Sequence, residues 1–189
     1  MQIIGHAIVS VDGKIAAADG SMPAELRNDA DWRRFQAQLD QSEIVVLGRK
    51  GHERFPNPGR RRLVATSSVV ALAVDPKDAR ATLWNPAGMS FPEAAQALGL
   101  GDRTVAVAGV FDLFAHLFTA FELAESQTLL LPEGLPCFSI GHPRLVLATK
   151  GLRLKAWEML DVAASVTLTS WVRPSHLSTH SYTFAGNLL

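Results

Sequence analysis

The sequence is short of cysteine, of excess charge and of long apolar runs, and each absence excludes a class of protein. Cys137 is the only cysteine, so no intrachain disulfide is possible and a cytoplasmic location is the simplest expectation. Lysine and arginine number 18, as do aspartate and glutamate, which leaves a formal net charge of zero. A general nucleic-acid binder needs excess positive charge, so we expect no nucleic-acid partner. No apolar run reaches the roughly 18 residues of a membrane span, so we expect no membrane partner.

Two further absences narrow the kind of site. The six histidines include no HExxH motif, and no zinc-type Cys/His cluster is present, so we expect no metal site. The opening segment MQIIGHAIVSVDGK has no basic stretch before its apolar part, so it is not predicted to be a signal peptide. Apolar residues make up 48% of the 189, which is enough to build the core of one folded domain.

The clearest local pattern is a buried strand that ends in a cationic turn. Ile44 to Leu47 is a continuous apolar run of mostly β-branched residues, as expected of a strand covered on both faces. Gly48 ends the run, and Arg49 and Lys50 follow it directly. Ligands of open α/β sheets bind at the carboxyl ends of strands, so this turn is a candidate site for an anionic group. An ordinary strand-to-helix turn with solvated cations explains the same pattern.

Two more strand ends carry comparable features. Leu63 to Thr66 is predicted as a strand with Ser67 after it, and its hydroxyl groups are suitable donors for a phosphate. Three consecutive arginines precede that strand, and such a run is typical of a solvated patch. Thr104 to Ala108 is predicted as a buried strand, followed by Gly109 and by a helix from Val110 to Phe118 that could direct its N-terminus at an anion. Glycine is also common in such turns for geometry alone.

A helix with one unusual carboxylate is predicted over residues 28–41, because an Asn-Asp pair can cap its start. Trp32, Phe35 and Leu39 recur at i, i+3 and i+7, so we expect them to form its buried stripe. Asp31 lies four residues before Phe35, about 40° round the helix, which places it beside that stripe. It is therefore a candidate for a role in a cleft. The alternative is a first-turn acid favoured by the helix dipole.

The remaining segments alternate between predicted strands and helices, which indicates one α/β domain with a mixed, mostly parallel sheet. A further strand is expected near residues 129–131. Leu145 to Thr149 and the alternating segment Ser165 to Val172 are predicted as antiparallel strands that end the domain. The domain is placed at residues 1–174, and residues 175–189 are expected to be a tail or an interface arm.

Two residues that often carry chemistry are interpreted as structural. His6 lies in the predicted strand Ile3 to Val11, where nothing nearby in the sequence completes a site, so we expect a hydrogen-bonded strand residue. Cys137 has no evident histidine or basic partner, so we expect a small buried apolar side chain. Neither is therefore a candidate site residue.

Five segments together carry a family resemblance. They are SVDGKIAAADG (Ser10 to Gly20), NDADWRRFQAQLDQSEIVVLGRKGHERFP (Asn28 to Pro56), RRLVATSS (Arg61 to Ser68), VAVAGVFDLF (Val105 to Phe114) and EGLPCF (Glu133 to Phe138). In this order they resemble the dihydrofolate reductase-like fold, and within it the reductase domain of the riboflavin-pathway deaminase-reductases and its stand-alone relatives. The resemblance implies a three-layer sandwich whose sheet ends in a C-terminal antiparallel hairpin, and a homodimer.

The same resemblance implies an NADPH-dependent reductase that acts on a C=N or C=O bond of a small heterocyclic substrate, of the pterin or riboflavin-pathway pyrimidine type. Asp31 falls where dihydrofolate reductases carry the acid that holds the pterin ring and guides its protonation, while the cofactor supplies hydride. The positions implied to bind the cofactor are Gly48, Arg49 and Lys50 beside the 2′-phosphate, Thr66 and Ser67 at the second strand end, Gly109, Val110 and Phe111 at the pyrophosphate, and Ala16 in the loop beside the nicotinamide.

Two positions depart from the family pattern. Val110 stands where the family has the second residue of a Gly-Gly pair, and a side chain there restricts the approach of the phosphates. Gly51 replaces a threonine, which removes a hydroxyl donor worth roughly 1.5–3 kcal/mol. Together they predict cofactor binding weaker by about one to several orders of magnitude. The alternative function is therefore a catalytically degenerate, dimeric nucleotide-binding protein of the same fold, and a third is a phosphate-binding module unrelated to nicotinamide.

Overall fold

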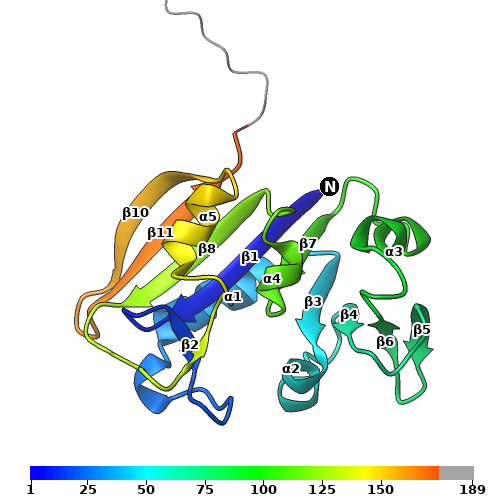
Figure 1. The fold of residues 1–189 in the computed structure, drawn as a ribbon, viewed down its shortest axis with the longest axis horizontal. Helices are drawn as coiled ribbons and strands as arrows, with labels where there is room; N and C mark the ends of the chain where they lie inside the picture. Colours follow the sequence, from blue (N-terminus) through cyan, green and yellow to red (C-terminus); the bar gives the residue numbers. More distant parts are fainter. Residues whose placement is uncertain (175–189) are drawn as a thin grey trace, which may run out of the picture.

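Nine strands form one mixed sheet in the computed structural model, which describes residues 1–174 (Figure 1). The strands are β1 (Gln2–Val9), β3 (Ile44–Gly48), β4 (Arg62–Ala65), β5 (Leu72–Asp75), β6 (Asp78–Trp84), β7 (Thr104–Val107), β8 (Ala120–Ser126), β10 (Arg153–Asp161) and β11 (Val166–Val172). Their order across the sheet is β10-β11-β8-β1-β7-β3-β4-β6-β5. The six strands from β8 to β6 in this order are parallel, whereas β11, β10 and β5 pair antiparallel to their neighbours. The expected mixed, mostly parallel sheet with a C-terminal antiparallel hairpin is confirmed.

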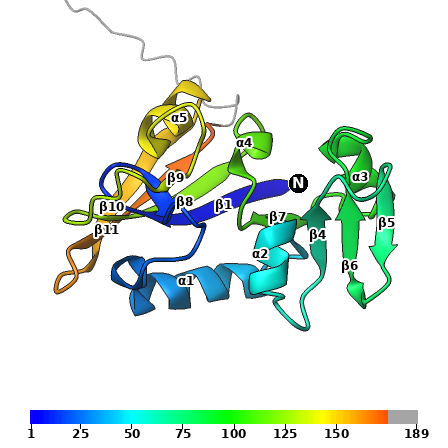
Figure 2. The same cartoon turned by 60° about the horizontal axis from the view of Figure 1, so that its bottom comes forward.

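Helices cover both faces of this sheet (Figure 2). They are α1 (Asp29–Asp40) and α2 (Arg49–Arg54) on one face, and α3 (Phe91–Ala97), α4 (Phe111–Phe114) and α5 (Pro143–Thr149) on the other. The side chains of β3 show how the sheet separates two cores, because successive residues of a strand point to opposite faces. Ile44 and Val46 belong to the core beneath α3, α4 and α5, while Val45 and Leu47 pack with Leu39 of α1. The predicted three-layer architecture is thereby confirmed.

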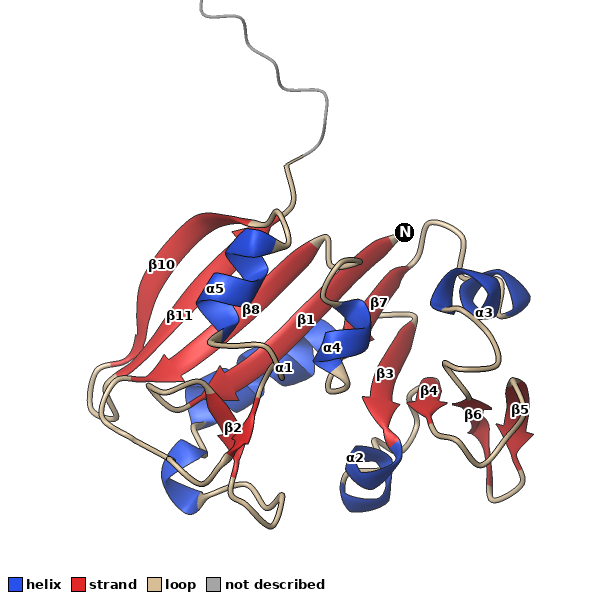
Figure 3. Cartoon of the chain, in the orientation of Figure 1, coloured by secondary structure: helices blue, strands red, loops and turns tan. Residues whose placement is uncertain are grey.

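Two short strands and a single helical turn lie outside the main sheet (Figure 3). β2 (Lys14–Ala16) pairs antiparallel with β9 (Leu135–Pro136), and the 3₁₀ turn η1 (Ala24–Leu26) precedes α1. Within residues 1–174, no helix is long and apolar enough to cross a membrane. The predicted C-terminal tail lies outside the described residues.

Side-chain caps explain where two of the helices begin. The Asn28 side chain accepts hydrogen bonds from the backbone N–H groups of Ala30 and Asp31, which satisfies two donors that α1 itself cannot pair. Ser90 and Glu93 form a reciprocal capping box at the start of α3. The helix predicted from the first of these caps, over residues 28–41, is confirmed as α1.

The prediction of a strand at Leu145 to Thr149 was wrong, because these residues form α5. Leu145 is exposed whereas Val146 and Leu147 are buried, and Pro143 occupies the first turn, where the missing N–H has no cost. A five-residue apolar run does not distinguish a strand from a short helix. The hairpin partner of β11 is instead β10, which is exposed along most of its length. The strand expected near residues 129–131 lies earlier, as β8.

Two helical predictions also need correction. The helix expected from Val110 to Phe118 is one turn, because α4 ends at Phe114. Trp32 was expected in the buried stripe of α1, but it is 52% exposed. Asp31 takes the place that was expected of Trp32 on the inward face of α1. The residues that point to the sheet are Asp31, Phe35 and Leu39, at i, i+4 and i+8.

The run of three arginines is not uniformly solvated. Arg62 is 1% exposed, and its guanidinium donates to Asp78 at 2.7 Å and to the carbonyl of Pro56. Arg60 and Arg61 make ion pairs nearer the surface, with Asp40 and Glu43. Alternate residues of a strand point to the same face of the sheet. Arg62 of β4 therefore points to the same face as Val64, which packs with Leu39 of α1.

We predict that Phe114→Ala lowers the free energy of unfolding by about 3–5 kcal/mol, because it leaves a large cavity in the core. Phe114 is fully buried and packs against the rings of Trp84, Phe91 and Phe118. Urea denaturation followed by circular dichroism measures the change. The matched control is Leu113→Ala, whose side chain is 40% exposed and whose loss is expected to cost less than about 1 kcal/mol. Equal losses for the two variants would contradict the prediction.

Candidate functional site

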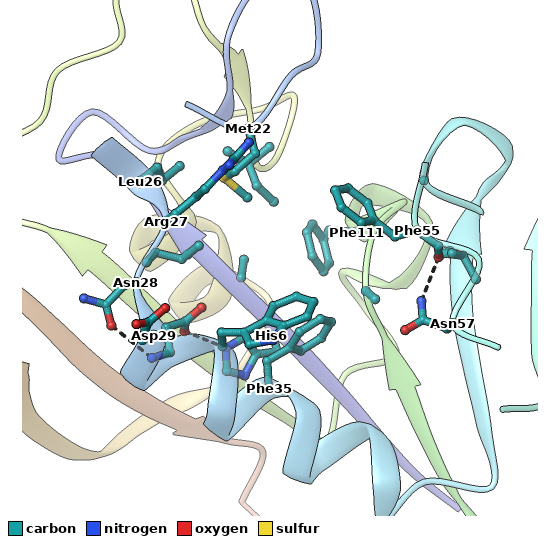
Figure 4. Close-up of a pocket in the computed structure, with 18 residues that line it drawn as sticks. His6, Met22, Leu26, Arg27, Asn28, Asp29, Phe35, Phe55, Asn57 and Phe111 are labelled. Carbon is teal, nitrogen blue, oxygen red and sulfur yellow. Dashed lines mark hydrogen bonds and ion pairs between the residues drawn. The ribbon is translucent and has the colours of Figure 1, made fainter. Parts of the chain in front are cut away.

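A cavity of about 510 Å³ opens between β1, α1, α2 and the segment before α1 (Figure 4). Apolar side chains form most of its wall, among them Phe35, Phe55 and Phe111. A few polar side chains converge on it, and they are His6, Arg27, Asn28, Asp29, Asp31 and Asn57. A concave, mainly apolar space with a few polar groups is the usual form of a small-molecule site.

Asp31 and His6 form a buried pair on one side of this cavity. Asp31 Oδ1 lies 2.8 Å from His6 Nε2, and the two residues are only 6% and 4% exposed. The His6 ring also packs against Phe35, with the ring centroids 5.0 Å apart. The cap at Asn28 fixes the first turn of α1 and so holds Asp31 over the sheet. The expectation that Asp31 lies beside a cleft therefore agrees with its position in the cavity wall.

A second carboxylate, Glu122 of β8, lies behind this pair. Glu122 Oε2 is 3.9 Å from His6 Nδ1, and Arg34 donates to both Glu122 oxygens, at 2.5 and 2.9 Å. Burial opposes the ionisation of Glu122, but the Arg34 hydrogen bond and the nearby positive charges lower the pKa of Glu122 overall. The hydrogen bond with Glu122 also raises the pKa of Arg34. The positive charge of Arg34 is therefore balanced mainly by Glu122, whereas the side chain that contacts Asp31 is His6.

Sequence reasoning missed His6 because its partners come from α1 and β8, which are distant in the chain. One signal was present in the sequence. A polar side chain in a strand that is otherwise apolar is expected to be buried, and a buried polar group requires a partner. That partner is Asp31, which the inward face of α1 places next to His6 of β1.

Arg49 and Lys50, the cations expected to bind phosphate, directly follow β3 and are exposed to solvent. Gly48 is the N-cap of α2 and has no side-chain cap. Arg49 is exposed and pairs with Glu53 at 2.9 Å, one turn further along α2, and Lys50 is exposed. The parallel register of β3 and β4 sets Gly48 opposite Ala65, so Thr66 and Ser67 follow at the neighbouring strand end. There Thr66 donates to the Ser68 hydroxyl, and Ser67 is exposed.

The third expected anion contact, at the end of β7, has an unusual backbone. Val110 adopts the left-handed conformation with φ of 51°, which is costly for a β-branched residue. A Cβ atom placed on Gly48 would lie 3.1 Å from Val110 Cγ1, so the valine side chain lies over Gly48. A Cβ on Gly109, by contrast, would meet only Gly48 N, at 3.9 Å. The ends of β3 and β7 therefore face each other, with the Val110 side chain between them.

The remaining sequence-predicted positions divide between the cavity wall and its surroundings. Phe111 lines the cavity together with Gly51 and Ala108, so the cavity continues toward the ends of β3 and β7. Ala16 lies on β2 and pairs with Leu135, while its neighbour Ile15 lines the cavity. Cys137, expected to be a buried apolar side chain, is 6% exposed, and burial raises the pKa of its thiol far above the usual value. In the part of the chain that the structure describes, no group of three or more His, Cys, Asp or Glu side chains is arranged to hold a metal ion.

Comparison with known proteins rests on solved structures, since no family model and no curated protein matches the chain. A Shewanella sp. PV-4 protein, named as a candidate riboflavin biosynthesis protein, matches with a TM-score of 0.66 at 17% identity, over 93% of this chain and 100% of its own. A diaminohydroxyphosphoribosylaminopyrimidine deaminase/5-amino-6-(5-phosphoribosylamino)uracil reductase from Thermotoga maritima matches with a TM-score of 0.62 at 15% identity, over 92% of this chain. Acinetobacter baumannii RibD matches with a TM-score of 0.63 at 14% identity, over 90% of this chain. The chain has the fold of RibD reductase domains.

This RibD-like fold confirms the resemblance drawn from the sequence. The chain spans 56% and 57% of the length of the Thermotoga and Acinetobacter proteins, and the full length of the Shewanella protein. At identities of 14–17% the similarity establishes the fold, and the chemistry has to be argued from the site itself.

The residues at the strand ends of the RibD-like fold fit NADPH, the implied cofactor, with two local departures. Exposed Arg49 and Lys50 can meet a 2′-phosphate, and the space beside Gly109 is open to a pyrophosphate. The cavity wall at Gly51, Ala108 and Phe111 joins this region to the space below Asp31. The departures are the Val110 side chain over Gly48 and the missing hydroxyl at Gly51.

Proposed function

We propose that the protein is an NADPH-dependent reductase of a small heterocyclic substrate, of the pterin or riboflavin-pathway pyrimidine type. The observation that carries the proposal is the buried Asp31–His6 pair in the wall of a cavity that continues toward the ends of β3 and β7, where Arg49 and Lys50 follow β3. A reductase of a C=N or C=O bond needs a hydride donor on one side of the substrate and a proton-handling group on the other. The cavity provides room for the substrate ring between those two positions.

The chain's own residues orient and enclose the substrate. Asp31 presents a carboxylate that accepts hydrogen bonds from an amidine or amide edge of a ring. Phe35, Phe55 and Phe111 supply apolar faces, and they exclude water from the reacting bond. When bound, NADPH supplies the hydride. The contribution of the protein is position and electrostatics.

Titration with NADPH and NADP⁺ tests the proposal. Trp32 lines the cavity, so its fluorescence is expected to change when the dinucleotide binds, and calorimetry gives the dissociation constant. Binding of NADPH, and its oxidation in the presence of a pterin or aminopyrimidine from a substrate panel, would support the function. Absence of binding at millimolar NADPH would overturn it, and equal affinity for ATP and NADPH would indicate a phosphate-binding module instead.

A second candidate function is a nucleotide-binding protein of this fold that has lost hydride transfer. The specific observation in its favour is Val110, whose side chain lies over Gly48 at the implied pyrophosphate position. This candidate expects NADPH to bind weakly and no member of the substrate panel to be reduced. Measurable turnover that depends on Asp31 would exclude it.

We also propose that the protein is a homodimer that pairs through β10. β10 is an edge strand whose first seven residues are exposed, so a row of backbone hydrogen-bonding groups is available to a second chain (Figure 1). Leu154, Trp157 and Met159 are 55%, 57% and 45% exposed, and their register with β11 places them on one face. An antiparallel two-fold pairing centred on Trp157 would set Arg153 opposite Asp161. The edge is therefore self-complementary in charge as well as apolar on one face.

We predict that Trp157→Lys converts this dimer to a monomer, because two lysines would meet on the two-fold axis. Light scattering during size-exclusion chromatography gives the mass of each variant. Val70→Lys is the matched control, since Val70 is 89% exposed and lies outside β10, and it is expected to remain dimeric. A parent protein that is monomeric at about 100 μM would contradict the proposal, since specific dimers commonly bind more tightly than this.

A further inference from the structure

Both ring nitrogens of His6 face hydrogen-bond acceptors, which restricts where its protons lie. Nε2 is 2.8 Å from Asp31 Oδ1, and Nδ1 is 3.2 Å from Gln38 Oε1. The Gln38 amide is oriented by its own Nε2, which donates to the carbonyl of Ile4 at 3.3 Å. Because an amide oxygen only accepts, Nδ1 of His6 carries a hydrogen.

The contact between Nε2 and the Asp31 carboxylate requires a second proton. These two atoms lie 2.8 Å apart, within hydrogen-bond distance, and a hydrogen on Nε2 would make this contact a charge-assisted hydrogen bond. The side chains of His6 and Asp31 are only 2% and 9% exposed, so a charge on either would have little contact with solvent and would be stabilised mainly by the other.

The charged groups packed around the His6–Asp31 pair are consistent with a positively charged His6 ring. Glu122 of β8 is 3.9 Å from Nδ1, and Arg34 of α1 neutralises it while also pairing with Glu158 of β10 at 2.9 Å. Asp29 of α1 and Arg27 before it are exposed at the cavity wall and carry opposite charges. Among the described residues, His6 is therefore the only buried group that could balance a negative charge on Asp31.

We propose that His6 is a positioning residue that acts as an imidazolium, holding Asp31 ionised through Oδ1 so that Oδ2 is free to accept hydrogen bonds from a ligand. Within residues 1–174, no side chain or backbone group donates to Oδ2. The ligand feature that fits is a ring edge with adjacent N–H donors. The identity of the substrate rests on the proposed function, but the protonation of His6 does not.

Nitrogen-15 NMR of protein labelled at histidine tests the proposal without any ligand. The six histidines are separated by comparing the parent spectrum with that of His6→Gln, which lacks the His6 signals. At pH 7 we expect both ring nitrogens of His6 to carry hydrogen, and we expect Asp31→Asn to convert the ring to the neutral form protonated at Nδ1. A His6 ring with one unprotonated nitrogen in the parent protein would overturn the proposal, whether or not the protein proves to be a reductase.

The pH dependence of turnover provides a second test once a substrate is reduced. In His6→Gln, the new amide can still donate to Asp31 Oδ1 but brings no positive charge. We expect the acid limb of the turnover profile to move to higher pH by at least one unit, while NADPH affinity stays within twofold of the parent. A profile that keeps its shape in His6→Gln would assign a purely structural role to His6 and overturn the proposal. Failure of NADPH to bind any variant would instead count against the proposed function and leave the NMR result to decide the role of His6.

Discussion

Val110→Gly is expected to tighten NADPH binding at least tenfold. The substitution removes the side chain that lies over Gly48, and glycine adopts the φ of 51° without the steric cost that valine has there. Relief of that strain, about 1–2 kcal/mol, offsets the loss of valine packing, so the melting temperature is expected to change little. Calorimetry with NADPH and thermal denaturation measure the two effects.

A graded series identifies the cause of the gain. Val110→Ala removes both γ-carbons but keeps a Cβ at positive φ, so its affinity is expected to lie between those of the parent and Val110→Gly. Gly51→Thr adds a hydroxyl donor at a position where a Cβ would meet only Leu47, at 3.9 Å, and it is expected to add a further gain. If Val110→Gly binds NADPH no better than the parent, then the side chain is not what limits the site.

Asp31→Asn is expected to lower turnover at least 100-fold with whichever heterocycle the parent reduces, in keeping with the usual 10²–10⁴-fold contribution of acid–base groups. The amide keeps the size of the side chain but loses the charge that pairs with His6. NADPH affinity is expected to stay within twofold of the parent, because the strand ends that would hold the cofactor are unchanged. Steady-state kinetics and NADPH titration measure the two quantities.

Asp40→Asn is the matched control for Asp31→Asn. Asp40 lies at the other end of α1, is exposed, and pairs with Arg60 at the surface, where an ion pair contributes about 0–1 kcal/mol. Its replacement is expected to leave turnover unchanged. If Asp31→Asn is folded by circular dichroism and retains more than a tenth of the parental turnover, Asp31 is not the group that the proposed function requires.

Much of this architecture could be predicted from the sequence, because the strongest patterns coincide with the elements that form the site. β3 was recognisable as a strand covered on both faces, and α1 from its cap and its inward residues. Asp31 was placed beside a cleft by its angle from Phe35, and it lines the cavity. Where the pattern was short, as at α5, a short helix that begins at a proline could not be distinguished from a strand.

Two features of the site could not be predicted because they depend on tertiary structure. The partner of His6 is 25 residues away in the chain, and only the packing of α1 on the sheet brings Asp31 within 2.8 Å of it. The valine at position 110 was visible as a departure from the family pattern, but its left-handed backbone and its position over Gly48 were not. The first of these long-range features carries the proposed function, and the second favours the alternative to it.

The central place of β1 has a consequence for the newly made chain. β1 is synthesised well before its neighbours in the sheet, β7 and β8, which begin only at Thr104 and Ala120. At about 5–20 residues per second, on the order of ten seconds pass before a ribosome has made both partners. During that interval the apolar segment Gln2–Val9 has no strand to pair with, so its apolar side chains and backbone hydrogen-bonding groups are exposed to other chains. The middle of the main sheet is thus completed only after the segments that form β3, β4, β5 and β6 have been made.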